Sequence, residues 1–72
     1  MVVFMKIEYS QDADVLIIRL RDDEVVDSVD LGEGVIAHLN EKGEVVEIEI
    51  LDASKSVDFR ELVLRIPSGV VA

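Results

Sequence analysis

The fold is decided by one stretch of the chain, Gly34 to Lys55, which reads GVIAHLNEKGEVVEIEILDASK. Two segments in it, Val35 to Asn40 and Glu44 to Leu51, carry apolar residues at every second position. A period of two is typical of β-strands with one buried face. The intervening Asn-Glu-Lys-Gly fits a type I turn that closes on a glycine in the left-handed region. The stretch therefore predicts a β-hairpin.

The second strand of this hairpin separates its two faces most clearly. Val46, Ile48 and Ile50 share one face, which we expect to be core. Glu47 and Glu49 share the other face with Val45, and we expect this face to be part of an acidic surface.

Three earlier segments also have strand periodicity, namely Met5 to Tyr9, Val15 to Leu20 and Val25 to Leu31. The second is apolar on both sides, which predicts either the central strand of the sheet or a face covered by another subunit. The third has no clean face, which predicts an edge strand or a bulge.

The periodicity changes after the hairpin. Asp58 and Glu61 have the spacing of a capping box. An apolar stripe at helical spacing follows, and Pro67 would end it. The stripe consists of Phe59, Leu62, Val63 and Ile66. The predicted fold is therefore mainly β (α+β): a five-stranded antiparallel meander with one short C-terminal helix.

The length predicts a single domain over residues 1–72, with residues 1–4 as an N-terminal extension and 68–72 as a tail. In this tail, Val70 and Val71 would add a short strand or dock on a partner. The chain has no cysteine, which excludes disulfides, thiolate metal sites and thiol redox chemistry. A helix of about two turns cannot cover five strands. We therefore expect a homo-oligomer, with a dimer as the first choice.

The charge is concentrated in the middle of the chain. Residues 22–52 hold eleven acidic side chains and one lysine, which accounts for more than the whole net charge of −9. Such a field repels phosphate backbones and favours a basic protein partner over direct nucleic-acid binding. No apolar run approaches the ~20 residues of a membrane span, and the start has no basic leader. We expect a cytoplasmic protein with no membrane partner.

Several segments together resemble a known family. They are Met5-Lys6-Ile7 with Tyr9, Ala13 to Ile17 with Leu20, Gly34-Val35, the turn Asn40 to Gly43, and Val46 to Ser54. In these segments the chain resembles the YuzE-like family of small prokaryotic proteins of unknown function. The resemblance implies a small mostly-β fold with a C-terminal helical piece, and no known activity or cofactor. The gene context of some members implies an antitoxin-like role.

His38 is the only histidine, and as a general base it would need a nucleophile and an orienting group. Ser28 and Ser54 are the candidate hydroxyls, but no spacing ties either one to His38. Ser54 and Lys55 form a second candidate pair, because a lysine can activate a serine. We instead expect Asp52 or Ser54 to cap the turn into the helix.

Close carboxylates suggest cation binding at two turns, Asp12 with Asp14 and Asp22 to Glu24. The spacing does not match an EF-hand, and turn formation explains these residues more simply. The sequence predicts no catalytic, cofactor-binding or metal-binding residue.

The sequence favours a non-catalytic interaction or oligomerisation module, antitoxin-like towards a basic partner. We expect its interaction surface to include His38, Glu47, Glu49 and Asp27. The alternative is a small-molecule-binding protein or small enzyme with a site at an oligomer interface near His38.

Overall fold

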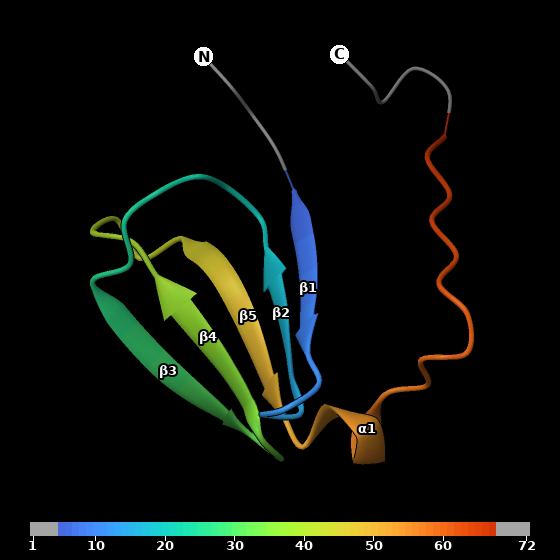
Figure 1. The fold of residues 1–72 in the computed structure, drawn as a ribbon. Coiled ribbons are helices and arrows are strands. Elements are labelled where there is room, and N and C mark those ends of the chain that lie inside the picture. The colour runs from blue at the N-terminus through green and yellow to red at the C-terminus, as the bar shows by residue number, and fades with distance from the viewer. Residues whose placement is uncertain (1–4, 68–72) are drawn as a thin grey trace.

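The computed structural model describes residues 5–67 as one open antiparallel sheet followed by a short helix (Figure 1). This confirms the predicted fold class, mainly β with five antiparallel strands and one short helix. The predicted extension at residues 1–4 and the tail at 68–72, with Val70 and Val71, lie outside the described residues. The elements are β1 (Lys6–Ser10), β2 (Val15–Arg19), β3 (Asp27–Gly32), β4 (Val35–Leu39), β5 (Val45–Leu51) and α1 (Ala53–Ser56).

The strands lie in the order β1-β2-β5-β4-β3, so their order corrects the predicted meander, in which neighbours in sequence would also be neighbours in space. β5 pairs with both β2 and β4, and its long alternating sequence suits this central place. β3 lies at the edge, with a register shift between Asp30 and Gly32. The prediction of an edge strand or bulge for this segment is therefore confirmed.

The central hairpin forms as predicted. The Gly43 N–H donates to the Asn40 carbonyl at 3.0 Å, and the Asn40 N–H donates to the Glu44 carbonyl at 3.0 Å. Gly43 has φ +80°, the left-handed conformation that the turn requires. At the other end, a Cβ on Gly34 would lie 3.2 Å from the Leu51 carbonyl oxygen, so the strands approach closely there.

The helix lies earlier in the chain than predicted. α1 occupies Ala53–Ser56, whereas residues 58–66 are not helical, so the prediction of a helix beginning at Asp58 is wrong. The Asp58 carboxylate accepts a hydrogen bond from the Arg60 backbone N–H at 3.0 Å and another from its guanidinium group at 2.6 Å. This contact resembles a helix N-cap, but the chain does not continue into a helix after it.

The register gives the sheet two chemically different faces. On one face Ile7 lies opposite Ile18, and on the other Arg19 lies opposite Glu47. The apolar face, as we use the term, carries Ile7, Tyr9, Leu16, Ile18, Val29, Val35, Ala37, Ile48 and Ile50. The polar face carries Lys6, Glu8, Val15, Ile17, Arg19, Ser28, Asp30, Ile36, His38, Glu47 and Glu49.

The buried core is small. Within residues 5–67, the buried hydrophobic side chains are Leu16, Ala37, Val46 and Ala53. On the apolar face, Ile7 and Val29 remain 46% and 42% exposed. The helix lies at one end of the sheet and covers neither face (Figure 1). The described residues, 5–67, therefore place no second layer of secondary structure over the apolar face.

Candidate functional site

A chain of three hydrogen-bonded side chains crosses the polar face. Ser28 of β3 lies opposite His38 of β4, and the Ser28 Oγ is 2.7 Å from the ring Nδ1. The His38 Nε2 is 2.8 Å from Oε1 of Glu49 on β5. No spacing in the sequence links Ser28 to His38. The pairing of β3 with β4 brings them together.

Serine, histidine and glutamate in a row are the groups that nucleophilic catalysis uses. Acyl transfer also needs preorganised donors for an oxyanion and a concave place for the substrate. His38 lines none of the three pockets at Arg19, Asn40 and Phe59. In this cross-strand polar ladder, each side chain satisfies its neighbour.

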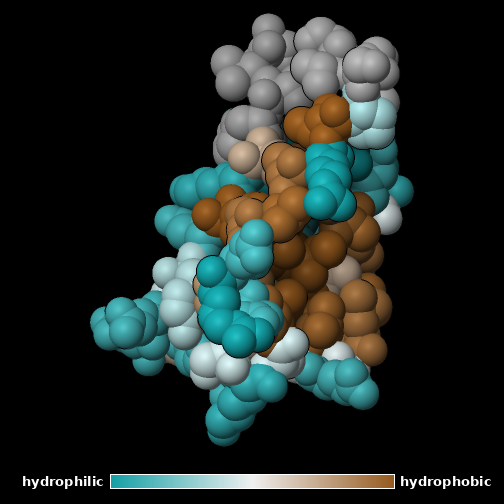
Figure 2. All heavy atoms as spheres, turned by 90° about the vertical axis from the view of Figure 1, so that its right-hand side faces the viewer, coloured by the Kyte–Doolittle hydropathy of each residue, from teal (hydrophilic) through white to brown (hydrophobic). Residues whose placement is uncertain are grey.

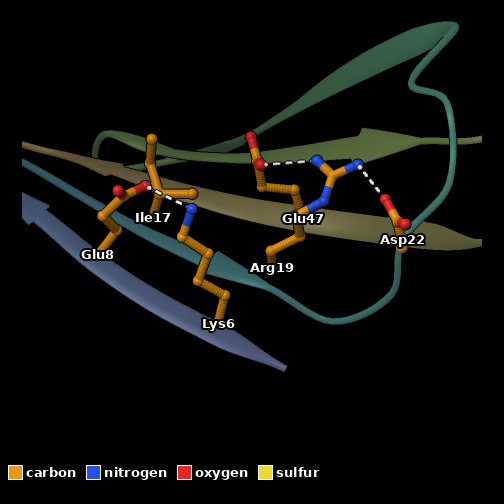
Figure 3. Close-up of a pocket in the computed structure, with 6 residues that line it drawn as sticks. All are labelled: Lys6, Glu8, Ile17, Arg19, Asp22 and Glu47. Carbon is orange, nitrogen blue, oxygen red and sulfur yellow. Dashed lines mark hydrogen bonds and ion pairs between the residues drawn. The ribbon is translucent and has the colours of Figure 1, made fainter. Parts of the chain in front are cut away.

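A pocket of about 340 Å³ opens on the same face, over β1, β2 and β5 (Figure 3). It is lined by Lys6, Glu8, Ile17, Arg19, Asp22 and Glu47. The Arg19 guanidinium donates to Glu47 at 3.1 Å and to the Asp23 carbonyl at 2.7 Å. Lys6 lies 3.6 Å from Glu8. Each cation of the lining already has a carboxylate partner, so the pocket presents paired charges to a ligand.

The structure brings together three of the four residues predicted for an interaction surface. Glu47 lies opposite His38, and Glu49 accepts its hydrogen bond, so all three share the polar face. Asp27 lies apart on the edge strand, opposite Leu39 and on the side of the apolar face. Its carboxylate accepts a hydrogen bond from the Ser28 N–H at 2.8 Å.

A second polar cluster fixes α1 to the turn between β1 and β2. Oδ1 of Asp14 accepts hydrogen bonds from the Tyr9 hydroxyl at 2.7 Å and from the Ser54 N–H at 2.9 Å. Oδ2 accepts the Ser54 hydroxyl at 2.7 Å, and the Asp14 carbonyl accepts the Ala53 N–H at 3.0 Å. Asp14 thus caps the helix from across the fold.

This cluster changes two sequence-based interpretations. Asp52 occupies the N-cap position of α1, but its side chain makes no capping hydrogen bond. The Ser54 hydroxyl donates to Asp14, forty positions away in the chain, which explains Ser54 without catalysis by Lys55. Asp14, for which the sequence suggests a turn or a cation site, is the residue that holds Ser54 in place.

A third cluster surrounds Asn40, the buried polar side chain of residues 5–67. Its Nδ2 donates to Asp23 and Glu44, both at 2.9 Å. Its Oδ1 accepts the backbone N–H groups of Lys42 and Glu44 at 3.0 and 2.9 Å. Asn40 therefore ties the connection between β2 and β3 to the central hairpin. Its amide lowers the pKa of both Asp23 and Glu44.

Residues 5–67 contain no group of three or more histidine, aspartate or glutamate side chains placed to hold a metal ion. In the same range, no helix has the length and apolar character needed to cross a membrane. Asp14, one of the carboxylates considered for cation binding, is engaged by Tyr9 and Ser54.

The family model described as "Protein of unknown function (DUF2283)" matches residues 6–54, which run from the first residue of β1 to the second residue of α1. The chain belongs to the DUF2283 family. A search of curated proteins and a search of solved structures gave no match. Membership of a family of unknown function agrees with the predicted resemblance, while the YuzE-like name stays a prediction.

The DUF2283 match contains Tyr9 and Asp14 and ends on Ser54, so it includes the whole of the Asp14 cluster. Within the matched segment, the last residue therefore hydrogen-bonds to the turn after the first strand. Residues 55–67 lie outside the match.

The Tyr9–Asp14 hydrogen bond links stability to pH at both ends of the scale. The Tyr9 hydroxyl, followed by Ser54, lowers the pKa of Asp14, and the same bond raises the pKa of Tyr9. A lowered carboxyl pKa stabilises the fold above the ordinary aspartate value, and this is lost as the pH falls through the folded value. A raised tyrosine pKa stabilises the fold below the ordinary tyrosine value, and this is lost as the pH rises through the folded value.

Replacing Tyr9 with phenylalanine is expected to raise the pKa of Asp14 towards its ordinary value, because the Tyr9 hydroxyl contributes most to the shift. Carboxyl-carbon NMR titration of the DUF2283 protein would measure this change. Ser10→Ala, at the exposed neighbouring position, serves as the control and should leave the pKa of Asp14 in place. An unchanged Asp14 titration in Tyr9→Phe would contradict this role of the hydroxyl.

Proposed function

We propose that this protein is a non-catalytic interaction module that pairs with a second copy through its apolar face. The observation that carries the proposal is the apolar face itself, over which residues 5–67 place no helix or second sheet. Ile7, Tyr9 and Val29 are each more than a third exposed in the single chain, although they share a face with the buried Leu16 and Ala37. A contiguous apolar face of this kind is typical of a subunit interface.

Charge supports a second copy as the occupant of this face. The charged side chains of β1, β2, β4 and β5 lie on the polar face. Two copies can therefore meet through their apolar faces while those charges point outwards. Sheets packed in this way lie ~10 Å apart, with their strands roughly aligned.

Light scattering of the unmodified chain at about 100 μM is expected to give the mass of a dimer. Ile7→Lys should weaken the dimer at least ~10-fold, because the substitution places a charge in an apolar interface. Glu8→Lys, at the next residue but on the polar face, should leave the dimer intact. Circular dichroism would confirm that both variants are folded. A monomer mass for the unmodified chain would overturn the proposal.

We further propose that the outward acidic surface receives a basic protein, in an antitoxin-like role. The net charge of −10 over residues 22–52 supports this, because opposite charge accelerates association. A basic protein that copurifies from the source cells at low salt and is released at high salt would support this role. Like the YuzE-like name, the prokaryotic source and the cytoplasmic location remain predictions.

The Ser28–His38–Glu49 chain supports one alternative function, hydrolysis of a small ester by a Ser28 nucleophile. Turnover of p-nitrophenyl acetate that disappears in Ser28→Ala and persists in Ser10→Ala would favour this alternative. Equal background hydrolysis by all three proteins would favour the polar ladder.

A further inference from the structure

We infer that the segment from Phe59 to Ile66 of one copy, hereafter the arm, packs against β3 of a second copy and seals the edge of the dimer. This inference rests on the proposed pairing of apolar faces. In the proposed dimer, the arm of the second copy covers Val29, at the exposed end of the apolar face.

The arm begins in a fixed position on its own sheet. The ring of Phe59 lies 4.5 Å from the ring of Tyr9, centroid to centroid, and Val57 is half-buried. A groove of about 130 Å³ separates the start of the arm from Ile7 and Leu16. The arm therefore starts on the apolar side of β1, and Figure 1 draws its trace roughly parallel to that strand and set apart from it.

Beyond Phe59 the arm has the properties of an unpaired strand. No backbone–backbone hydrogen bond joins residues 59–67 to any other described residue. Leu62, Leu64 and Ile66 alternate with Val63 and Arg65, which is the period of a β-strand. Leu62 and Leu64 are 76% and 71% exposed, so the arm's own sheet does not cover them.

The side of the molecule that carries the arm shows a continuous band of hydrophobic side chains bordered by hydrophilic ones (Figure 2). At the opposite edge of the sheet, β3 exposes Val29 on the apolar face and Leu31 beside the register shift. The two edges therefore each carry exposed apolar groups, but they are separated by the full width of one sheet.

A two-fold axis parallel to the strands would bring these edges together. When two aligned sheets pack face to face about an axis parallel to their strands, the rotation reverses the strand order. β1 of one copy then faces β3 of its partner. Because the arm lies on the apolar side of β1, it comes to lie against the partner's β3, and this contact occurs twice.

The contact area also favours the arm. Five strands ~4.8 Å apart and about five residues long cover roughly 350 Å². A stable interface buries about 800 Å² on each partner, so the sheet face alone falls short. Leu62, Leu64 and Ile66 would each add roughly 100 Å² of apolar surface. The arm thus brings the total nearer to what a stable dimer needs.

Cysteine pairs can test this contact directly, because the chain has no cysteine of its own. A mixture of Val29→Cys and Leu64→Cys chains, oxidised mildly, is expected to give a covalent dimer containing one chain of each kind. Ser28→Cys mixed with Leu64→Cys is the matched control, since Ser28 lies on the polar face of the same strand. The control should give at most one-tenth of the mixed dimer.

Three experimental outcomes distinguish the arm contact from the pairing of apolar faces. A dimer mass by light scattering without the mixed Val29→Cys/Leu64→Cys disulfide would overturn the arm contact and leave the pairing of apolar faces intact. A single chain carrying both substitutions that closes its disulfide at monomer mass would show that the arm packs on its own sheet, and would also overturn the arm contact. A monomer mass for the unmodified chain would overturn both proposals.

Discussion

Val46→Asp is expected to leave the chain unfolded. Val46 is the largest fully buried side chain in the structure, with no exposed surface. A carboxylate there would be buried without a partner, which costs several kcal/mol, and the apolar burial of valine, about 1.5–3 kcal/mol, would be lost. A domain of this size is stable by only about 4–11 kcal/mol. Loss of NMR chemical-shift dispersion and of the far-ultraviolet β signal would show unfolding.

Val26→Asp is the matched control, because it makes the same chemical change at a valine that is 57% exposed. The expected change in its free energy of unfolding is within about 0.5 kcal/mol. If Val46→Asp instead unfolded cooperatively with nearly unchanged stability, the position of Val46 at the centre of the core would be wrong.

Asn40→Ala should lower the free energy of unfolding by about 2–4 kcal/mol. The substitution leaves two backbone N–H groups, from Lys42 and Glu44, without their acceptor. It also frees the connection between β2 and β3, which Asn40 holds through Asp23. Urea unfolding monitored by circular dichroism measures the change.

Glu41→Ala, in the same turn but exposed, should change stability by less than about 0.5 kcal/mol. NMR titration adds an independent readout. The pKa values of Asp23 and Glu44 should rise in Asn40→Ala, because the Asn40 amide is the largest cause of lowering for both. Unmoved titrations together with unchanged stability would contradict the structural role of Asn40.

The strands could be predicted from the sequence because their information is local. Alternation in residues 44–51 and the Asn40 to Gly43 turn are enough to place β4 and β5, and both are observed. The order of the strands is not local. Nothing in the periodicity of β2 states that its second neighbour is β5. That pairing joins Arg19 to Glu47, 28 positions away, and depends on which faces fit together.

The sequence predicts the helix in the wrong place because two hydrophobic periods coexist after Val57. The apolar residues Phe59, Leu62, Val63 and Ile66 fit a helical stripe, while Leu62, Leu64 and Ile66 also fit a strand. The interaction that decides where the helix lies is the cap that Asp14 provides to Ser54. A cap from a distant residue leaves no local signature of the kind that predicts a helix start.

The candidate site likewise depends partly on local sequence signals and partly on pairings between distant residues. Residue type alone pointed to His38, and the alternation of β5 placed Glu47 and Glu49 on one face, as observed. Ser28 joined this group only through the register of β3 with β4. Asn40 was assigned to a turn, but that assignment could not show that its amide also reaches Asp23, seventeen residues away.

The place of β5 between β2 and β4 has a consequence for the order of folding during synthesis. As the chain leaves the ribosome, β1 with β2 and β3 with β4 can each form a hairpin, but these two hairpins share no edge. An isolated two-stranded hairpin is marginally stable at best in water. The sheet therefore cannot assemble until residues 45–51 emerge and join the halves, and any nascent chain that stops short of them presents two unstable hairpins to chaperones and proteases.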